Sequence, residues 1–499
     1  MKYFVYSFLS FLILISFVSS EECKLEDNCR LVDINGDDEW INIPGHYRSI
    51  QKCLDDVNDG DTCLIRSGNY QEEIFIAEKS NIDIRGDADY LLPVIDGTVE
   101  LKPQESYDSD GDGIADGKWK EESIDGNTVC VGNIDVINDK HPFQLFLKDK
   151  KMEEHEMMTN ARWPNALWSD RDSETGAPMV FYNQFWGKSD ETSTRGKMVD
   201  RKDSNGVSPL AESGLDMKGA MAVLNVGSFN TFVKPVKDHN AGDDYFTYED
   251  DFGDIKFVPE HNQYYLDSSE VLLDNPGEWY YNMKTNTLKF MPWSGSCPDL
   301  ATNAVRGRVI DYGIDVSKTD GISISNINFF AANIRAEAYS NHDIEMNEVY
   351  LDSLNFKYPS SSKRMLQDFN VPKITRVVGR SEGTISVRNC EFFGGEGPAL
   401  FYWGKSAKIH NNFFKWNDWS GQMELTKNGG DGTVYGPNAQ TGEEFIGNTL
   451  WYNGASAGLK PGKNPVVKDN LVVGQCDGLI MSDGAGIQIQ VLIYYCVLP

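Results

Sequence analysis

Asparagine recurs at a nearly constant spacing through the C-terminal half of this 499-residue chain. Successive steps are 21, 42, 22, 37 and 22 residues along the series Asn326, Asn347, Asn389, Asn411, Asn448 and Asn470. A period near 22 does not arise from one helix or from a simple array of hairpins. It fits a solenoid whose coils each contribute short parallel strands and stack on the next coil. The spacing therefore predicts stacked coils, and the longer steps predict coils with loop insertions.

Stacking would place equivalent side chains of successive coils at the inter-strand spacing of about 4.8 Å. At that distance asparagine amides can hydrogen-bond up and down the stack, as amide ladders do in cross-β assemblies. An apolar or aromatic residue stands three positions after each asparagine, which predicts a row in the core: Phe329, Tyr350, Phe392, Phe414, Trp451 and Val473.

The segment Ser49–Ile76 has the pattern of a short amphipathic helix, an Asp-Gly turn and then the first strands. A helix here would cover the open end of the first coil, whose unpaired strand edges otherwise favour aggregation. We therefore expect an N-terminal helical cap.

The asparagine repeat and this N-terminal segment resemble the right-handed parallel β-helix proteins of the pectate-lyase-like superfamily. Two further segments, Met157–Asn165 and Asn275–Trp293, resemble segments of β-helix glycosidases. The resemblance implies an all-β fold: a right-handed parallel β-helix solenoid with an N-terminal helical cap and a large β-rich insertion. It also implies a secreted carbohydrate-active protein.

The sequence pattern changes along the chain and divides it into five segments. The 22-residue spacing is absent from a central region, where short β-like runs alternate with Pro, Gly and Asp clusters. The expected segments are a signal peptide at 1–20, a cap with the first β-helix coils and an acidic loop (105–117) at 21–126, a β-rich insertion at 127–310, further coils at 311–490 and an apolar tail at 491–499. Because a solenoid needs a polar terminal cap, the apolar tail predicts a truncated chain that aggregates when expressed.

The N-terminus has the pattern of a secretory signal. Lys2 precedes the apolar run Phe4–Val18, and small residues follow that run. The run is shorter than the roughly 20 residues that span a membrane, so we expect a secreted, extracellular protein. Its nine cysteines then allow disulfides, and the pairs Cys23/Cys29 and Cys53/Cys63 are close in sequence. The odd number leaves at least one thiol without a partner in the chain.

The formal net charge of −30 restricts the partners of the protein. Nucleic acid is excluded, because affinity for it depends on neutralising phosphates with Lys and Arg. A polyanionic substrate would need calcium or a local basic groove to offset the field. We expect a polysaccharide substrate, no membrane span, no organic cofactor and a monomeric protein.

The asparagine repeat brings two carboxylates together. Glu396 stands seven residues after Asn389, and Asp418 stands seven residues after Asn411, so both occupy the same place on adjacent coils. Carboxyl groups about 5–5.5 Å apart suit a retaining glycosidase. Two carboxylates so close also push their pKa values apart, which supplies an acid and a base. Glu424 and Asp431 lie in the same region and are further candidates.

Aromatic and basic residues accompany this pair. Trp416 and Trp419 flank Asp418, and with Trp403 they could bind sugar rings on their flat faces. Lys427 and Lys463 follow the ladder asparagines at a similar spacing. In β-helix polysaccharide lyases a Lys or Arg acts as the base, so the resemblance implies that one of these lysines could abstract a proton, and Lys463 could also hold substrate.

An acidic loop precedes the insertion. Its carboxylates Asp108, Asp110, Asp112 and Asp116 occupy positions 1, 3, 5 and 9, and Gly113 occupies position 6. Hard oxygen ligands around a tight turn are typical of a calcium loop. The bidentate Glu expected at position 12 is absent, since that position is Trp119. The spacing nevertheless predicts Ca²⁺ bound by the four aspartates.

The sequence thus predicts a secreted glycoside hydrolase that cleaves a polysaccharide with Glu396 and Asp418. Two alternatives stay open. One is a calcium-assisted polysaccharide lyase or epimerase that uses Lys427 or Lys463 as its base. The other is a surface or matrix protein that only binds glycan.

Overall fold

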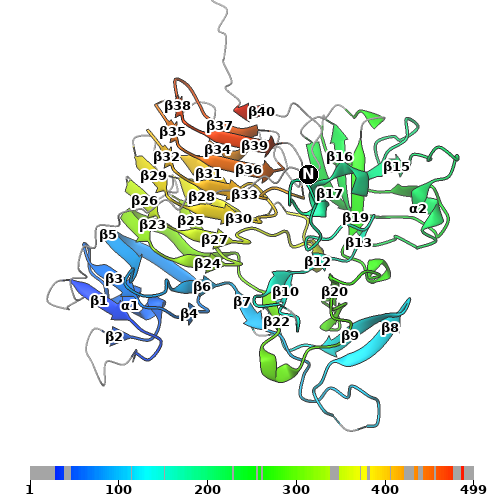
Figure 1. The fold of residues 1–499 in the computed structure, drawn as a ribbon, viewed down its shortest axis with the longest axis horizontal. Helices are drawn as coiled ribbons and strands as arrows, with labels where there is room; N and C mark the ends of the chain where they lie inside the picture. Colours follow the sequence, from blue (N-terminus) through cyan, green and yellow to red (C-terminus); the bar gives the residue numbers. More distant parts are fainter. Residues whose placement is uncertain are drawn as a thin grey trace, which may run out of the picture.

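The computed structural model describes residues 28–36, 38, 46–113, 115–136, 138–150, 152–227, 230–253, 257–259, 262–337, 348–370, 372–378, 383–404, 406–420, 432–436, 442–454, 457–475 and 485–487. The predicted signal peptide at 1–20 and the predicted tail at 491–499 lie outside these residues. Within them the regular secondary structure is mostly β-strand, with two short α-helices, α1 (Ile50–Asp56) and α2 (Pro209–Glu212). Figure 1 shows long parallel sheets beside a region of mixed sheets.

From β23 (Tyr312–Ser325) onward the chain repeats a set of three short strands, here called a repeat. Each strand pairs in parallel with the equivalent strand of the next repeat, so the strands form stacks. The later first strands are β26 (Glu348–Asp352), β29 (Thr384–Arg388), β32 (Lys408–His410), β35 (Glu444–Ile446) and β38 (Val466–Lys468). The second strands are β24 (Asn328–Phe330), β27 (Asn355–Lys357), β30 (Glu391–Phe393), β33 (Phe413–Lys415), β36 (Thr449–Asn453) and β39 (Leu471–Gln475). The third strands are β25 (Asn333–Glu337), β28 (Thr375–Val378), β31 (Leu400–Trp403), β34 (Gly432–Tyr435), β37 (Ala457–Lys460) and β40 (Ala485–Ile487).

The N-terminal strands extend the same stacks. β5 (Ile74–Gly86) pairs with β23 and with β3 (Thr62–Ile65), and β3 pairs with β1 (Cys29–Val32). β6 (Val94–Asp96) pairs with β24 and with β4 (Asn69–Tyr70), and β1 also pairs with β2 (His46–Tyr47). Ser49 caps α1 by accepting from the backbone N–H of Lys52, and the helix buries Ile50, Cys53 and Leu54 in the core of the stacks.

Phenylalanines form a column through the core of the repeats. Phe329, Phe356, Phe392 and Phe414 stack with ring centroids 4.7, 4.7 and 5.1 Å apart along the column, and Leu450 and Val472 continue its register. The predicted row is therefore right at Phe329, Phe392 and Phe414. It is wrong at Tyr350, which belongs to β26, and one position late at Trp451 and Val473. A one-residue shift in a strand moves a side chain to the opposite face.

The structure contains an asparagine ladder, but the asparagines of the sequence repeat occupy two different positions within a structural repeat. Asn326, Asn389 and Asn411 occupy turns with left-handed backbone (φ 54° to 56°), which asparagine tolerates. The buried ladder runs one residue later, where Asn412 Nδ2 donates to Asn448 Oδ1 (3.0 Å) and Asn448 Nδ2 donates to Asn470 Oδ1 (2.8 Å). A second ladder joins Asn417 to Asn453 (3.1 Å). Asn347 lies outside the described residues.

Strands between β6 and β23 pair among themselves and form the mixed-strand domain (residues 98–308). It has its own hydrophobic clusters, and a disulfide between Cys130 and Cys297 joins two of its distant segments. Its strands are β7 (Thr98–Glu100), β8 (Lys120–Ile124), β9 (Asn127–Asn133), β10 (Gln144–Leu147), β11 (Glu156–Met157), β12 (Thr159–Asn160), β13 (Arg162–Trp163), β14 (Gly187–Lys188), β15 (Lys197–Val199), β16 (Met221–Gly227), β17 (Asn230–Pro235), β18 (Tyr245–Thr247), β19 (Gln263–Asp267), β20 (Glu278–Asn282), β21 (Thr287–Phe290) and β22 (Val305–Arg308).

The other disulfides bear on the sequence predictions. Cys53 and Cys63 are bonded, as their spacing predicted. Cys29 is also in a disulfide, while Cys390 is a buried free thiol. None of the helices in the described part of the chain has the length and apolar character needed to cross a membrane.

Candidate active site

Glu396 and Asp418 lie in equivalent segments of two adjacent repeats. Glu396 follows β30, and Asp418 follows β33, the strand that pairs with β30. The backbone N–H of Asp418 donates to the carbonyls of Gly395 (2.8 Å) and Gly397 (3.0 Å), the two neighbours of Glu396. The backbone N–H of Gly395 donates to Asn417 Oδ1 (3.1 Å). The 22-residue spacing therefore does bring this pair of side chains to the same edge of the stack.

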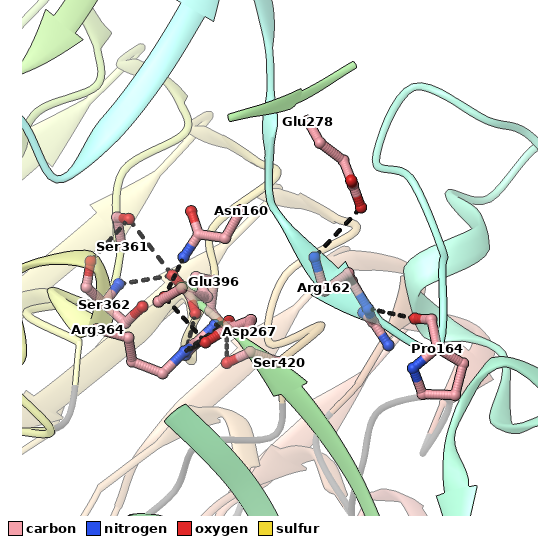
Figure 2. Close-up of polar contacts among 11 residues, drawn as sticks. Asn160, Arg162, Pro164, Asp267, Glu278, Ser361, Ser362, Arg364, Glu396 and Ser420 are labelled. Atoms are coloured by element: carbon pink, nitrogen blue, oxygen red, sulfur yellow. Dashed lines mark hydrogen bonds and ion pairs between the residues drawn. The ribbon is translucent and has the colours of Figure 1, made fainter. Parts of the chain in front are cut away.

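The Glu396 side chain is buried, and among the described residues it accepts hydrogen bonds from a guanidinium, a backbone N–H and a hydroxyl group (Figure 2). One oxygen accepts from Arg364 Nη1 (2.6 Å). The other accepts from the backbone N–H of Ser362 (2.6 Å) and from Ser361 Oγ (3.3 Å). A charge-assisted hydrogen bond from the guanidinium and a bond from a backbone N–H thus hold both oxygens of Glu396 in place.

Arg364 bridges Glu396 to the mixed-strand domain. Its Nε donates to both oxygens of Asp267 (2.9 and 3.2 Å), and its Nη2 lies 2.8 Å from Asp267 Oδ2. Asp267 is the last residue of β19, and all three side chains are buried. The site is thus formed jointly by the repeats and by the mixed-strand domain.

Asp418 differs from Glu396 in its surroundings. Its side chain is fully buried, and neither carboxylate oxygen has a hydrogen-bond partner among the described residues. Burial, and secondly the charge of Glu396, raise the pKa of Asp418 to about 8. Asp418 is therefore protonated at neutral pH, and the two neighbouring carboxyl groups carry different charge states.

Three other buried polar atoms near this pair lack partners in the described part of the chain. They are Tyr265 Oη, Trp416 Nε1 and Trp419 Nε1. Tyr265, on β19, lies against Arg364, with the guanidinium carbon 5.8 Å from its ring centroid. Buried polar groups in proteins are almost always hydrogen-bonded, so each of these atoms is a position that water or a polar ligand could occupy.

Trp416 and Trp419 do not form an open platform. Both pack against Trp168 of the mixed-strand domain, with ring centroids 6.1 and 5.9 Å apart, in a buried aromatic cluster. Trp403, at the end of β31, is 48% exposed. The structure therefore buries two of the three candidate tryptophans in one aromatic cluster and leaves the third on the surface.

The remaining candidates for catalysis lie elsewhere or are outside the described residues. Three of them lie outside the described residues: Glu424, Lys427 and Asp431. Lys463 lies in the segment that joins β37 to β38, and its carbonyl accepts from the backbone N–H of Gly442. Glu396 and Asp418 lie instead in segments that lead from second to third strands, so Lys463 belongs to a different edge of the stack.

Sequence reasoning missed Arg364, Asp267 and the two serines that contact Glu396. The segment that carries Ser361, Ser362 and Arg364 follows β27 and lies in the 42-residue step between Asn347 and Asn389, where a loop insertion was predicted. A run of three serines followed by basic residues was the available signal, since small polar residues allow backbone N–H groups to approach a carboxylate. Asp267 carried no local signal of its role.

The acidic loop gathers three of its four predicted ligands. One oxygen from each of Asp108, Asp110 and Asp112 lies within 4.8 Å of the others. The fourth, Asp116, instead accepts from the hydroxyl and the backbone N–H of Ser109 (2.7 and 3.3 Å). Backbone N–H groups of Gly113 and then Gly111 hold the pKa of Asp108 below its usual value.

Comparisons with known proteins give limited matches. No family model matches the chain, and no curated protein matches its sequence. A solved structure described as a glycoside hydrolase aligns over 92% of this chain and 97% of its own, with a TM-score of 0.47 and 14% identity. XylC in complex with xylose aligns over 92% of this chain and 69% of its own, with a TM-score of 0.35 and 9% identity. At these values the two structures assign neither a family nor an activity to the chain.

Proposed function

We propose that this protein is a retaining glycoside hydrolase in which Glu396 is the nucleophile and Asp418 is the acid/base. One observation carries the proposal: two buried carboxyl groups on adjacent repeats, one held by Arg364 and by a backbone N–H, the other with a raised pKa and without a partner among the described residues. Retaining glycosidases need this combination at a short separation. Strands stacked about 4.8 Å apart supply such a separation.

The reaction proceeds in two steps. In the first, the Glu396 carboxylate attacks the anomeric carbon, the bond from that carbon to the leaving oxygen breaks, and Asp418 donates its proton to that oxygen. In the second, ionised Asp418 takes a proton from water while the water oxygen attacks the anomeric carbon and releases Glu396. The second step restores both groups to their starting charge states.

The surroundings of the pair support a sugar as the ligand. Hydroxyl groups of a sugar could pair with Trp416 Nε1, Trp419 Nε1 and Tyr265 Oη, which are buried and lack partners among the described residues. The parallel stacks support a right-handed parallel β-helix solenoid of the pectate-lyase-like kind. We also infer from the N-terminal signal pattern that the enzyme acts outside the cell on a polysaccharide or its fragments.

A screen of neutral and acidic polysaccharides and aryl glycosides tests this function. We expect new reducing ends, no ultraviolet absorbance from an unsaturated product, and a first product that keeps the anomeric configuration of the substrate. Absorbance from a new double bond would instead establish a lyase. Binding without either product would establish a glycan-binding protein, and inversion of configuration would contradict the nucleophile role of Glu396.

We further propose that Asp108, Asp110 and Asp112 hold Ca²⁺, with Asp116 able to join once it leaves Ser109. Calcium prefers carboxylate oxygens, and clustered carboxylates repel one another without a cation. A ligand bound only to the folded state adds about 2.7 kcal/mol of stability at 100 times its Kd.

We therefore expect excess calcium to raise the Tm relative to excess chelator, and the change D110N/D112N to abolish the difference. D172N is a matched control, because Asp172 also organises an exposed turn through its carboxylate. Equal Tm values in calcium and chelator would exclude calcium binding at this loop.

A further inference from the structure

We propose that Arg364 is a positioning residue for Glu396 and that Asp267 anchors Arg364, so that the mixed-strand domain sets the orientation and charge of the nucleophile. The proposal rests on the function proposed above. Figure 2 shows the arrangement: Arg364 lies between Asp267 and Glu396, and the two carboxylates come from different parts of the fold.

The geometry of Arg364 indicates that it orients the Glu396 carboxylate and does not only balance its charge. Three of its donor contacts go to Asp267 and one to Glu396, and the planar guanidinium fixes the angle between them. The Arg364 side chain is 1% exposed, and the carboxylates are 2% and 4% exposed, so neither ion pair is weakened by water. Breaking a buried pair by removing one partner costs several kcal/mol, because the other charge stays buried.

The segment that carries Arg364 is itself held in place. Arg308 Nη1 donates to the carbonyl of Tyr358 (3.0 Å) and its Nη2 to that of Pro359 (2.9 Å). The backbone N–H of Glu396 donates to the carbonyl of Ser360 (3.0 Å). Arg308 is the last residue of β22 in the mixed-strand domain. That domain therefore contacts the site twice, through Arg308 and through Asp267.

The charged groups around Glu396 determine how its protonation changes when Arg364 or Asp267 is substituted. Arg364 lies between it and Asp267, Arg308 of β22 interacts with it electrostatically, and Asp418, whose pKa its charge helps to raise, belongs to the next repeat. One cation therefore lies directly between two carboxylates. Replacing Arg364 with a neutral residue leaves the Glu396 carboxylate subject to the negative charge of Asp267. Neutralising Asp267 instead leaves the positive charge of Arg364 to act on Glu396 without a second carboxylate.

The test measures kcat/KM against pH for R364M, R364K, D267N and the parent. The acid limb of this profile reports the loss of charge on Glu396. We expect the limb to move to higher pH in R364M and to lower pH in D267N, and to return toward the parent in the double variant. R364K should keep the limb near the parent but lower kcat by roughly 100-fold, because an ammonium cannot hold both carboxylates in one plane.

A matched control and a second readout keep the two proposals separate. D96N breaks another buried ion pair that involves β6 and the mixed-strand domain, Asp96 with Arg306 (2.9 Å), and should leave the limb unchanged. Titration of ¹³C-carboxyl glutamate, with the Glu396 signal identified by its absence in E396Q, measures the same charge without turnover. An acid limb and a titration that stay fixed in both R364M and D267N would overturn the positioning role, even if E396Q is inactive. Shifts in the titration of a protein that hydrolyses nothing would support the positioning of Glu396 and overturn the proposed function.

Discussion

Replacing Glu396 with Gln, or Asp418 with Asn, is expected to lower kcat by roughly 1,000-fold or more on any substrate that the parent hydrolyses. The amide of E396Q could not form the covalent intermediate, and the amide of D418N could neither donate nor accept the proton. Both substitutions keep the shape of the side chain, so the fold should persist. Steady-state kinetics with an aryl glycoside and a polysaccharide would measure the loss.

Two further observations make this expectation specific. E391Q is the control, because Glu391 lies on β30 of the same repeat as Glu396 and is only partly buried; its kcat should stay near that of the parent. With an activated aryl glycoside, azide should restore turnover to variants of the nucleophile or the acid/base in which the carboxylate is removed by Ala or Gly. Near-parent rates in both E396Q and D418N would show that the site lies elsewhere.

D418N is also expected to be more stable than the parent at neutral and alkaline pH. The folded state holds a proton on Asp418 up to about pH 8, whereas the unfolded chain releases it near the ordinary aspartate pKa of 3.8. The free energy of unfolding of the parent therefore falls between these values as pH rises, by up to about 1.4 kcal/mol per pH unit. Asn does not titrate, and it tolerates the left-handed backbone at this position (φ 60°).

Denaturant unfolding at pH 5, 6, 7 and 8 would measure this effect as a stability difference that widens with pH. D200N is the matched control. Asp200 is also buried and its pKa is also raised by burial, but its oxygens accept from Ser208, Leu210 and Tyr264. Replacing it should destabilise the protein, because an amide cannot accept all three hydrogen bonds. A D418N variant that loses stability at every pH would contradict the buried, protonated state of Asp418.

The sequence was sufficient to place Glu396 beside Asp418, because a regular repeat fixes the position of each residue along the stack. Glu396 and Asp418 are 22 residues apart, which is one repeat, so their adjacency followed from counting. The same counting was wrong by one residue at Asn411 and Trp451, because asparagine is favoured both in left-handed turns and in buried ladders. Spacing alone cannot separate these two roles, whereas backbone conformation does.

Residues outside the repeats could not be assigned in this way. Asp267 reaches Arg364 across 97 positions, and the contact depends on how the mixed-strand domain packs against the repeats. Trp416 and Trp419 were expected to bind sugar rings on their flat faces because they flank Asp418 in the sequence. Their burial depends on Trp168, whose position no local pattern indicates.

Insertion of the mixed-strand domain between β6 and β23 has a consequence for synthesis of the protein. β5 obtains its partner β23 only after the whole domain has emerged, since contacts such as Thr319 with Ile76 join residues 243 positions apart. At translation rates of about 5–20 residues per second, the edge of β5 waits on the order of 10 to 50 s for that partner. During this interval a strand with alternating apolar side chains has an unpaired edge, which is a template for association with other chains. Production of this protein should therefore depend more on chaperones that shield nascent strand edges than on the stability of the finished fold.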